Sequence, residues 1–154
     1  MPGAVMVQTD ATSRFTVLFP DERDGWSDSV GRLLEPQGVQ TIVARSGRQA
    51  LELIRTTPIH CAVLDVRMPQ LGGLQVIKLM RELPAPPPAI LLTQHQTGHL
   101  LREALGMQVF SVLLKPVDFN LLLDTLARVI RRFYENRWPV ATAPLRGPTS
   151  TLSN

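Results

Sequence analysis

The chain lacks the features that mark membrane and exported proteins. No apolar run comes near the roughly 18 residues that a membrane span requires, and the N-terminus MPGAVMVQTD has no basic flank followed by an apolar stretch. The single cysteine, Cys61, excludes an internal disulfide, and its place in the apolar stretch HCAVLD indicates a packed residue in a reducing compartment. These absences predict a soluble protein of the cytoplasm that does not act on a membrane.

Excess charge is also scarce, since the formal net charge of the 154 residues is only +3. Part of the excess lies in RVIRRFYENR, where Arg128, Arg131 and Arg132 fall on the outer side of a predicted helix and Arg137 follows. No DNA-binding motif accompanies these arginines. We interpret them as a solvated helix face and do not expect the protein to bind nucleic acid.

The sequence does contain five short apolar segments of strand length. They are FTVLF from Phe15, VQTIVA from Val39, CAVLD from Cys61, AILLT from Ala89 and FSVLL from Phe110. Several are apolar throughout, which is typical of strands that are covered on both faces. Segments with helical spacing of apolar residues alternate with them. This alternation predicts an α/β fold with a doubly wound, five-stranded parallel sheet.

The apolar residues of the predicted helices recur at intervals of three or four positions. They are Val30, Leu33 and Leu34; Ala50, Leu51 and Ile54; Leu74, Ile77 and Met80; Leu100, Leu101, Ala104 and Leu105; and Leu122, Leu126, Val129, Ile130 and Phe133. Asp118 stands at the expected N-cap of the last helix. Beyond Asn136 the chain is rich in proline and small polar residues. We therefore predict a flexible N-terminal segment over 1–12, a folded domain over 13–136 and a flexible Pro-rich tail over 137–154.

Polar residues follow four of the predicted strands at the point where each strand ends. They are Asp21 and Glu22 after the first, Asp65 at the end of the third, Thr93 at the end of the fourth, and Lys115 with Pro116 after the fifth. In doubly wound sheets the ligand site lies beyond the carboxyl ends of the strands, so these residues are expected at one rim. Three carboxylates gathered there repel one another unless a cation joins them. Oxygen ligands that leave room for water and phosphate favour Mg²⁺.

This set of side chains suits an aspartyl-phosphate site. The carboxylate of Asp65 can attack a phosphorus atom while the metal and Lys115 neutralise charge on the transferring oxygens. The hydroxyl of Thr93 adds a donor for a phosphoryl oxygen. The sequence therefore predicts Asp65 as phosphoacceptor, with Thr93 and Lys115 beside it.

The most specific motif is LDVRMPQLGGL, which begins at Leu64. It places a methionine, a proline and a glycine after the predicted acceptor, namely Met68, Pro69 and Gly73. Thr93 and Lys115 follow Asp65 by 28 and 50 residues. On these residues and intervals the chain resembles the receiver domains of two-component response regulators, over about Arg14 to Tyr134.

The resemblance implies a flavodoxin-like sheet of strand order 2-1-3-4-5 and a Mg²⁺ site. The implied metal ligands are Asp21, Glu22, Asp65 and the backbone carbonyl of Arg67. Thr93 would be the switch hydroxyl, and the Lys115–Pro116 bond is expected to be cis.

The resemblance also implies a signalling domain and not an enzyme. The tail over 137–154 is too short and too poor in apolar residues to fold as an output domain, so we expect the domain to stand alone. A sensor histidine kinase or a phosphotransfer protein would phosphorylate Asp65, and the face of the fourth helix, fifth strand and fifth helix would then bind a downstream protein. The sequence leaves open the kinase, the downstream partner and whether the protein forms a homodimer.

Several positions depart from the receiver pattern. The acidic pair is Asp-Glu, Gln94 stands after Thr93 where a small residue is usual, and Val112 stands where the last strand usually carries an aromatic residue. We expect Phe110 to lie on the same strand face as Val112, where it either replaces that aromatic residue or packs in the core. We expect metal binding to survive the Asp-Glu pair, whereas Gln94 and Val112 favour one alternative, a receiver-shaped binding module that acts without phosphorylation.

Two enzyme-like or cofactor-binding relatives of similar topology fit the sequence poorly. A phosphatase of the haloacid dehalogenase type resembles a D-x-D pattern, but Arg67 stands two residues after Asp65. A flavin-binding relative requires a Ser/Thr/Gly phosphate loop after the first strand. The segment PDERDGW at that place is acidic and repels phosphate.

Overall fold

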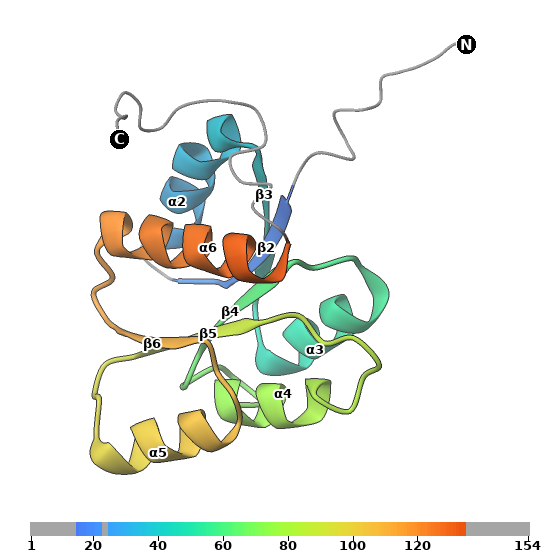
Figure 1. Cartoon of the computed structure of the whole chain (residues 1–154), viewed down its shortest axis with the longest axis vertical. Coiled ribbons are helices and arrows are strands. Elements are labelled where there is room, and N and C mark those ends of the chain that lie inside the picture. Colours follow the sequence, from blue (N-terminus) through green and yellow to red (C-terminus); the bar gives the residue numbers. More distant parts are fainter. Residues whose placement is uncertain (1–14, 23–24, 135–154) are drawn as a thin grey trace.

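A parallel sheet forms the centre of the computed structural model, which describes residues 15–22 and 25–134 (Figure 1). Its strands are β2 (Phe15–Pro20), β3 (Val39–Ala44), β4 (Cys61–Asp65), β5 (Ala89–Thr93) and β6 (Ser111–Leu114). They pair in the order β3-β2-β4-β5-β6, which is 2-1-3-4-5 along the chain. The predicted fold class and strand order are confirmed. The predicted flexible segments, 1–12 and 137–154, lie outside the described residues.

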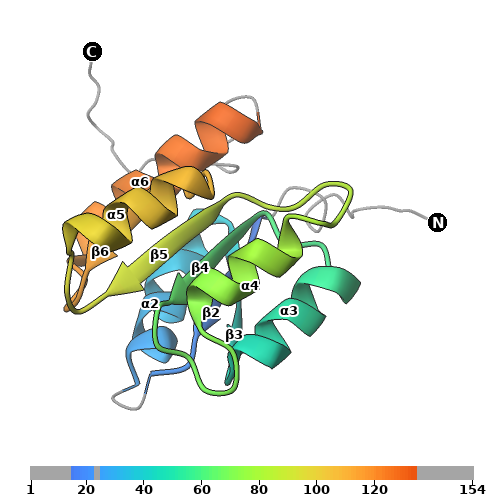
Figure 2. The same cartoon turned by 90° about the horizontal axis from the view of Figure 1, so that it is seen from below.

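Helices cover both faces of this sheet. They are α2 (Trp26–Leu34), the 3-10 helix η1 (Glu35–Gln37), α3 (Gly47–Thr56), α4 (Gly73–Met80), α5 (Gly98–Gly106) and α6 (Phe119–Phe133). Helices α2 and α6 lie on one face, and α3, α4 and α5 lie on the other (Figures 1 and 2). Asp118 caps α6 as predicted, because its side chain accepts a hydrogen bond from the backbone N–H of Asn120. Within the described ranges, no helix has the length and apolar content needed to cross a bilayer.

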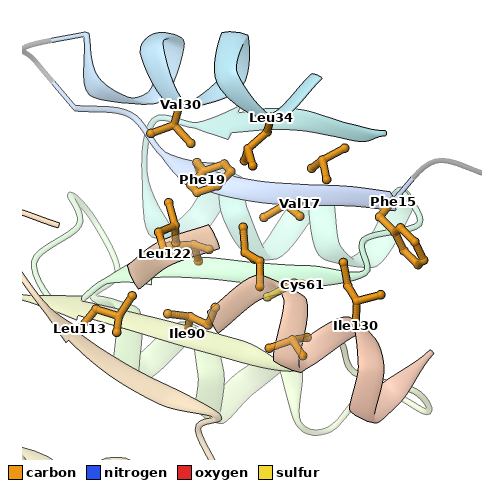
Figure 3. Packing of buried hydrophobic residues seen from close by; sticks show 14 of the residues in the cluster. Phe15, Val17, Phe19, Val30, Leu34, Cys61, Ile90, Leu113, Leu122 and Ile130 are labelled. Atoms are coloured by element: carbon orange, nitrogen blue, oxygen red, sulfur yellow. The ribbon is translucent and has the colours of Figure 1, made fainter. Parts of the chain in front are cut away.

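Buried side chains fill the space between the sheet and each helical layer. Figure 3 shows the cluster on the α2 and α6 face, where Phe19 and Ile90 from the sheet meet Leu122 from α6. Cys61 is fully buried in this cluster, and burial raises the pKa of its thiol far above the ordinary value. The opposite cluster includes Leu64, packed beneath α3 and α4. Cys61 is therefore a core residue, as the sequence predicts.

The helical segments are confirmed, but four of the apolar residues that defined them are exposed. They are Leu33, Leu101, Leu105 and Phe133. Leu105 is the extreme case, with 76% of its surface exposed, whereas Ala104 beside it is buried. Helical spacing reveals an apolar stripe but does not fix its edges, because the edges depend on where the sheet lies.

The expectation that Phe110 and Val112 share one strand face is wrong, whereas the alternative that Phe110 packs in the core is confirmed. Strand β6 begins at Ser111, so Phe110 precedes the strand, and the alternation of side chains does not extend to it. Phe110 packs on the α6 side, where its ring lies 6.1 Å from that of Phe133. Val112 packs in the opposite cluster. Phe110 therefore does not replace the aromatic residue that Val112 lacks.

Gly73 permits α4 to begin directly behind the end of β4. A Cβ atom at Gly73 would overlap the backbone carbonyl oxygen of Asp65, so any larger residue must push α4 away from the strand. We expect Gly73→Ala to lower the free energy of unfolding by about 1–3 kcal/mol, the usual cost of overpacking, as measured by urea denaturation.

Gly106→Ala is the matched control for this prediction. Gly106 ends α5, and a Cβ atom there meets nothing within 4 Å. Because alanine favours helix by up to about 1 kcal/mol over glycine, the control is expected to be neutral or stabilising. Equal losses of stability in the two variants would refute the packing argument.

Candidate functional site

The predicted polar residues lie at the carboxyl edge of the sheet, where parallel strands bring their ends together. Asp65 and Thr93 are the last residues of β4 and β5, and both are buried, with 6% and 5% of their surfaces exposed. Glu22 follows β2, and Lys115 follows β6. The Lys115–Pro116 peptide is cis, as predicted.

Lys115 joins two of the carboxylates. Its Nζ lies 2.5 Å from Asp65 Oδ2 and 3.2 Å from Glu22 Oε1. The remaining Asp65 oxygen, Oδ1, accepts a hydrogen bond of 2.8 Å from the backbone N–H of Arg67. One ammonium group thus offsets the repulsion between two carboxylates and orients both of them.

The pKa of Lys115 lies above its ordinary value. Burial alone would lower the pKa of this ammonium group, but the hydrogen bond and charge of Asp65, followed by those of Glu22, outweigh burial. Lys115 therefore stays protonated well into alkaline solution. A positive charge is therefore held beside Asp65 at neutral pH.

Thr93 is buried beside this cluster, but its hydroxyl is engaged within its own loop. The Oγ1–H donates to the carbonyl oxygen of His95 at 3.0 Å, and Oγ1 accepts from the N–H of His95 at 3.1 Å. Asp65, Thr93, Gln94 and Lys115 line a common cavity of about 240 Å³. Thr93 is thus near the cluster but turned toward the loop that follows β5.

Asp21 is the third carboxylate that the sequence predicts at this site. It is exposed, and its backbone N–H donates to the carbonyl of Ala44 at 2.9 Å. Across the described ranges, no three histidine, cysteine, aspartate or glutamate side chains form a group arranged to hold a metal ion. The chemistry of the donors nevertheless fits Mg²⁺, because Glu22 and Asp65 present carboxylate oxygens to one shared cation.

Two residues that the sequence did not single out hold the loops of this site. Ser27 is buried in α2, where its Oγ–H donates to the carbonyl of Pro20 at 2.8 Å and its Oγ accepts from the N–H of Glu22 at 3.4 Å. Gln96 reaches from the loop after β5 to β6, and its Nε2 donates to the carbonyl of Val112 at 3.1 Å. All three bonds join a side chain to main-chain atoms of another segment, and a main-chain partner cannot be recognised from residue types in the sequence.

A family model matches most of this chain. The model described as the response regulator receiver domain covers residues 17–127, a span that includes Glu22, Asp65, Thr93 and Lys115.

Curated relatives agree with this match. The transcriptional regulatory protein ZraR of Escherichia coli K12 is 33% identical over 98 residues, which make up 64% of this chain and 22% of ZraR. The regulatory protein AtoC of the same strain is 30% identical over 116 residues, 75% of this chain and 24% of AtoC. The chain therefore spans less than a quarter of the length of these relatives.

The comparison with solved structures also finds a receiver domain. The receiver domain of the Francisella response regulator 1452 superposes on this chain with a TM-score of 0.71 and is 27% identical in sequence. The superposition covers 77% of this chain and 98% of that domain.

The raised pKa of Lys115 predicts a specific pH dependence of stability. A lysine whose pKa is higher in the folded state stabilises the fold below its ordinary pKa of about 10.4, and this contribution is lost as the pH rises through the folded-state value. We expect Lys115→Gln to be less stable than wild type near about pH 8, with the difference shrinking toward about pH 11. Urea unfolding of both proteins across this range measures the effect.

Lys78→Gln is the control, because Lys78 is the only other lysine of the chain and is exposed on α4. It is expected to change stability little, and by a similar amount at every pH. A difference between wild type and Lys115→Gln that stays constant across the range would contradict the assignment.

Proposed function

The chain belongs to the response regulator receiver domain family, and from this membership and the Lys115–Asp65 contact we propose that it accepts a phosphoryl group on Asp65 in two-component signalling. The supporting observation is the 2.5 Å approach of Lys115 Nζ to Asp65 Oδ2, at the edge of a cavity that a phosphoryl group can enter. The proposed role is that of a signalling domain and not of an enzyme with its own substrate.

In this reaction a carboxylate oxygen of Asp65 attacks the phosphorus of a phosphohistidine. The new O–P bond forms as the P–N bond breaks, and the departing imidazole keeps the electron pair of that bond. Lys115 neutralises charge that develops on the phosphoryl oxygens, and the N–H of Arg67 holds the carboxylate in place. Thr93 would leave His95 and donate its hydroxyl hydrogen to a phosphoryl oxygen.

The ligands that we propose for Mg²⁺ are the carboxylates of Asp21, Glu22 and Asp65 and the backbone carbonyl of Arg67. Bound Mg²⁺ supplies positive charge to the phosphoryl oxygens. Glu22 and Asp65 already converge on Lys115, so they need only share their oxygens between two cations. Ser27 fixes the segment that carries Glu22.

The proposed upstream partner is a sensor histidine kinase or a phosphotransfer protein. The proposed downstream surface is the face of α5, β6 and α6, where large apolar side chains are exposed. They are Leu101 at 43%, Leu105 at 76% and Leu114 at 49% of their surfaces. The loop that carries Thr93 leads directly into α5 through the N-cap Thr97. A change at Thr93 can therefore reach this face through a short, continuous segment.

The second candidate is a receiver-shaped binding module that acts without phosphorylation. The observation that favours it is the place of Phe110, which packs on the α6 side and leaves Val112 without an aromatic substitute. Gln94 also lines the cavity at Asp65 and can hinder access to it. This candidate predicts partner binding that does not change when Asp65 is replaced.

Phosphorylation of Asp65 can be tested directly. We expect incubation with acetyl phosphate and Mg²⁺ to raise the intact mass by one phosphoryl group in wild type and not in Asp65→Asn. Glu22→Gln is expected to slow the reaction because it removes a proposed metal ligand. Asp124→Asn is the control, since Asp124 is an exposed carboxylate on α6 and should react like wild type. A folded wild-type protein that gains no mass, or an Asp65→Asn variant that does, would defeat the proposal.

Beryllofluoride with Mg²⁺ distinguishes a working switch from a binding module. If the switch works, amide NMR shifts are expected over the Thr93 loop, α5 and β6, and Gln96→Ala should reduce the shift at Val112 because it removes the bond between the loop and β6. Gln40→Ala, an exposed change on β3, should leave the pattern unchanged. Shifts restricted to the residues that touch Asp65 would favour the binding module.

A further inference from the structure

A second cavity lies at the edge of the sheet opposite Asp65. It has a volume of about 670 Å³ and is formed by the end of α4, the loop before β5, the turn before β6 and the last turns of α6. Ala89, the first residue of β5, lines it, whereas Thr93, the last residue of the same strand, lines the cavity at Asp65. Figure 2 shows the C-terminal end of α6 and the loop before β5 on the side away from the arrowhead of β5. We call this cavity the amino-edge groove.

The floor and one wall of the amino-edge groove are apolar and rigid. Ile77, Met80 and Phe110 contribute apolar side chains. The wall consists of the consecutive prolines 86–88, which have no backbone N–H and a fixed φ angle. Such a wall does not have to be ordered when a ligand binds, which lowers the entropy cost of binding.

Arg81 fixes the opposite wall. Its Nη1 donates to the carbonyl of Met107 at 2.5 Å, and its Nη2 donates to Oε1 of Gln108 at 3.1 Å. These two bonds tie the end of α4 to the turn before β6. The groove is thus preformed on both sides.

The charge of the amino-edge groove is positive. Arg81, Arg128 and Arg132 line it, and no acidic residue does so in the described part of the chain. Arg128 is partly neutralised by Asp124, whose Oδ2 lies 3.2 Å from Arg128 Nε. Arg132 is exposed and forms no ion pair with a described carboxylate.

Two of these guanidinium groups lie over aromatic rings. Arg128 is 5.8 Å from the ring centre of Phe110, and Arg132 is 5.4 Å from that of Phe133. The contact limits the positions of each side chain while leaving guanidinium donors available. Phe133 is itself 47% exposed. Positive charge and apolar surface therefore occur together at the mouth of the groove.

From these features we infer that the amino-edge groove binds an acidic segment of a partner protein that also carries an aromatic or aliphatic side chain. The apolar side chain would enter between the proline wall and Phe110, and carboxylates would pair with Arg128 and Arg132. This site lies at the edge opposite Asp65 and does not rest on the phosphorylation proposed there.

The chain's own ends are poor occupants on grounds of charge. Residues 135–154 contain one acidic residue, Glu135, against Arg137 and Arg146. Residues 1–14 contain Asp10 and Arg14, which cancel. Neither segment carries the net negative charge that complements the groove.

Fluorescence anisotropy with a labelled peptide that alternates glutamate with phenylalanine and leucine tests this inference on the full chain. We expect binding with a Kd below about 1 mM and a loss of roughly tenfold or more in Arg132→Glu, since charge reversal turns attraction into repulsion. Arg131→Glu is the matched control, because Arg131 is the exposed neighbour on α6 that does not line the groove. That variant and Asp65→Asn should bind within about twofold of wild type.

Four results would overturn the inference. The first two are that the peptide does not bind, or that Arg131→Glu and Arg132→Glu weaken its binding equally. The other two are that a peptide with lysine in place of glutamate, or a peptide with glycine in place of phenylalanine and leucine, binds as tightly as the original peptide. Sedimentation equilibrium adds a fifth. Self-association that Arg132→Glu abolishes would assign the groove to a second copy of the chain. Circular dichroism confirms folding of each variant, and Arg132→Gln replaces Arg132→Glu if the latter does not fold.

Discussion

The attraction between one ammonium group and two carboxylates is the constraint on which the site depends. Asp65 ends a strand that is buried along its whole length, so its charge lies where water is scarce. A buried carboxylate destabilises a fold unless a partner compensates for the lost hydration. Lys115 provides that compensation from a position 50 residues later in the chain. The sheet must therefore assemble as far as β6 before the charge on Asp65 is balanced, and the stability of the fold is coupled to the state of the site.

The strands could be predicted from sequence because parallel strands covered on both faces are apolar throughout, and such runs need no tertiary information to be recognised. The buried faces of the helices were harder to predict. Leu105 has the spacing of a core residue yet is exposed. Apolar residues that recur every three or four positions form a stripe along a helix, but only the neighbouring elements decide which members of the stripe are buried. Phe110 was misplaced for a related reason, since alternation applies only within the strand and β6 begins one residue later.

The site also combines features that the local sequence predicts with features that only the tertiary structure reveals. Glu22, Asp65 and Lys115 could be predicted to lie close together. Each follows or ends a strand, and in doubly wound sheets the ligand site lies beyond the carboxyl ends of the strands. The exposure of Asp21 could not be predicted, because Asp21 and Glu22 occupy adjacent positions and only the path of the loop separates them. Ser27 and Gln96 were missed because each side chain bonds to main-chain atoms of another segment, and residue types do not identify such partners.

The two edges of the sheet hold their loops by different contacts. At the amino edge, consecutive prolines and the two bonds of Arg81 hold the groove in one shape. At the carboxyl edge, the loop after β5 is held by the hydroxyl of Thr93 and by the exposed side chain of Gln96. A hydrogen bond of this kind contributes about 1 kcal/mol net. If Asp65 is phosphorylated as proposed, a new bond from Thr93 to a phosphoryl oxygen would be strong enough to replace it, because hydrogen bonds to charged groups contribute more, about 1.5–3 kcal/mol. Under the proposed function, the edge that carries Asp65 is thus the edge that a phosphoryl group would rearrange. The bond from Gln96 to the carbonyl of Val112 would link that rearrangement to β6 without requiring an aromatic side chain there.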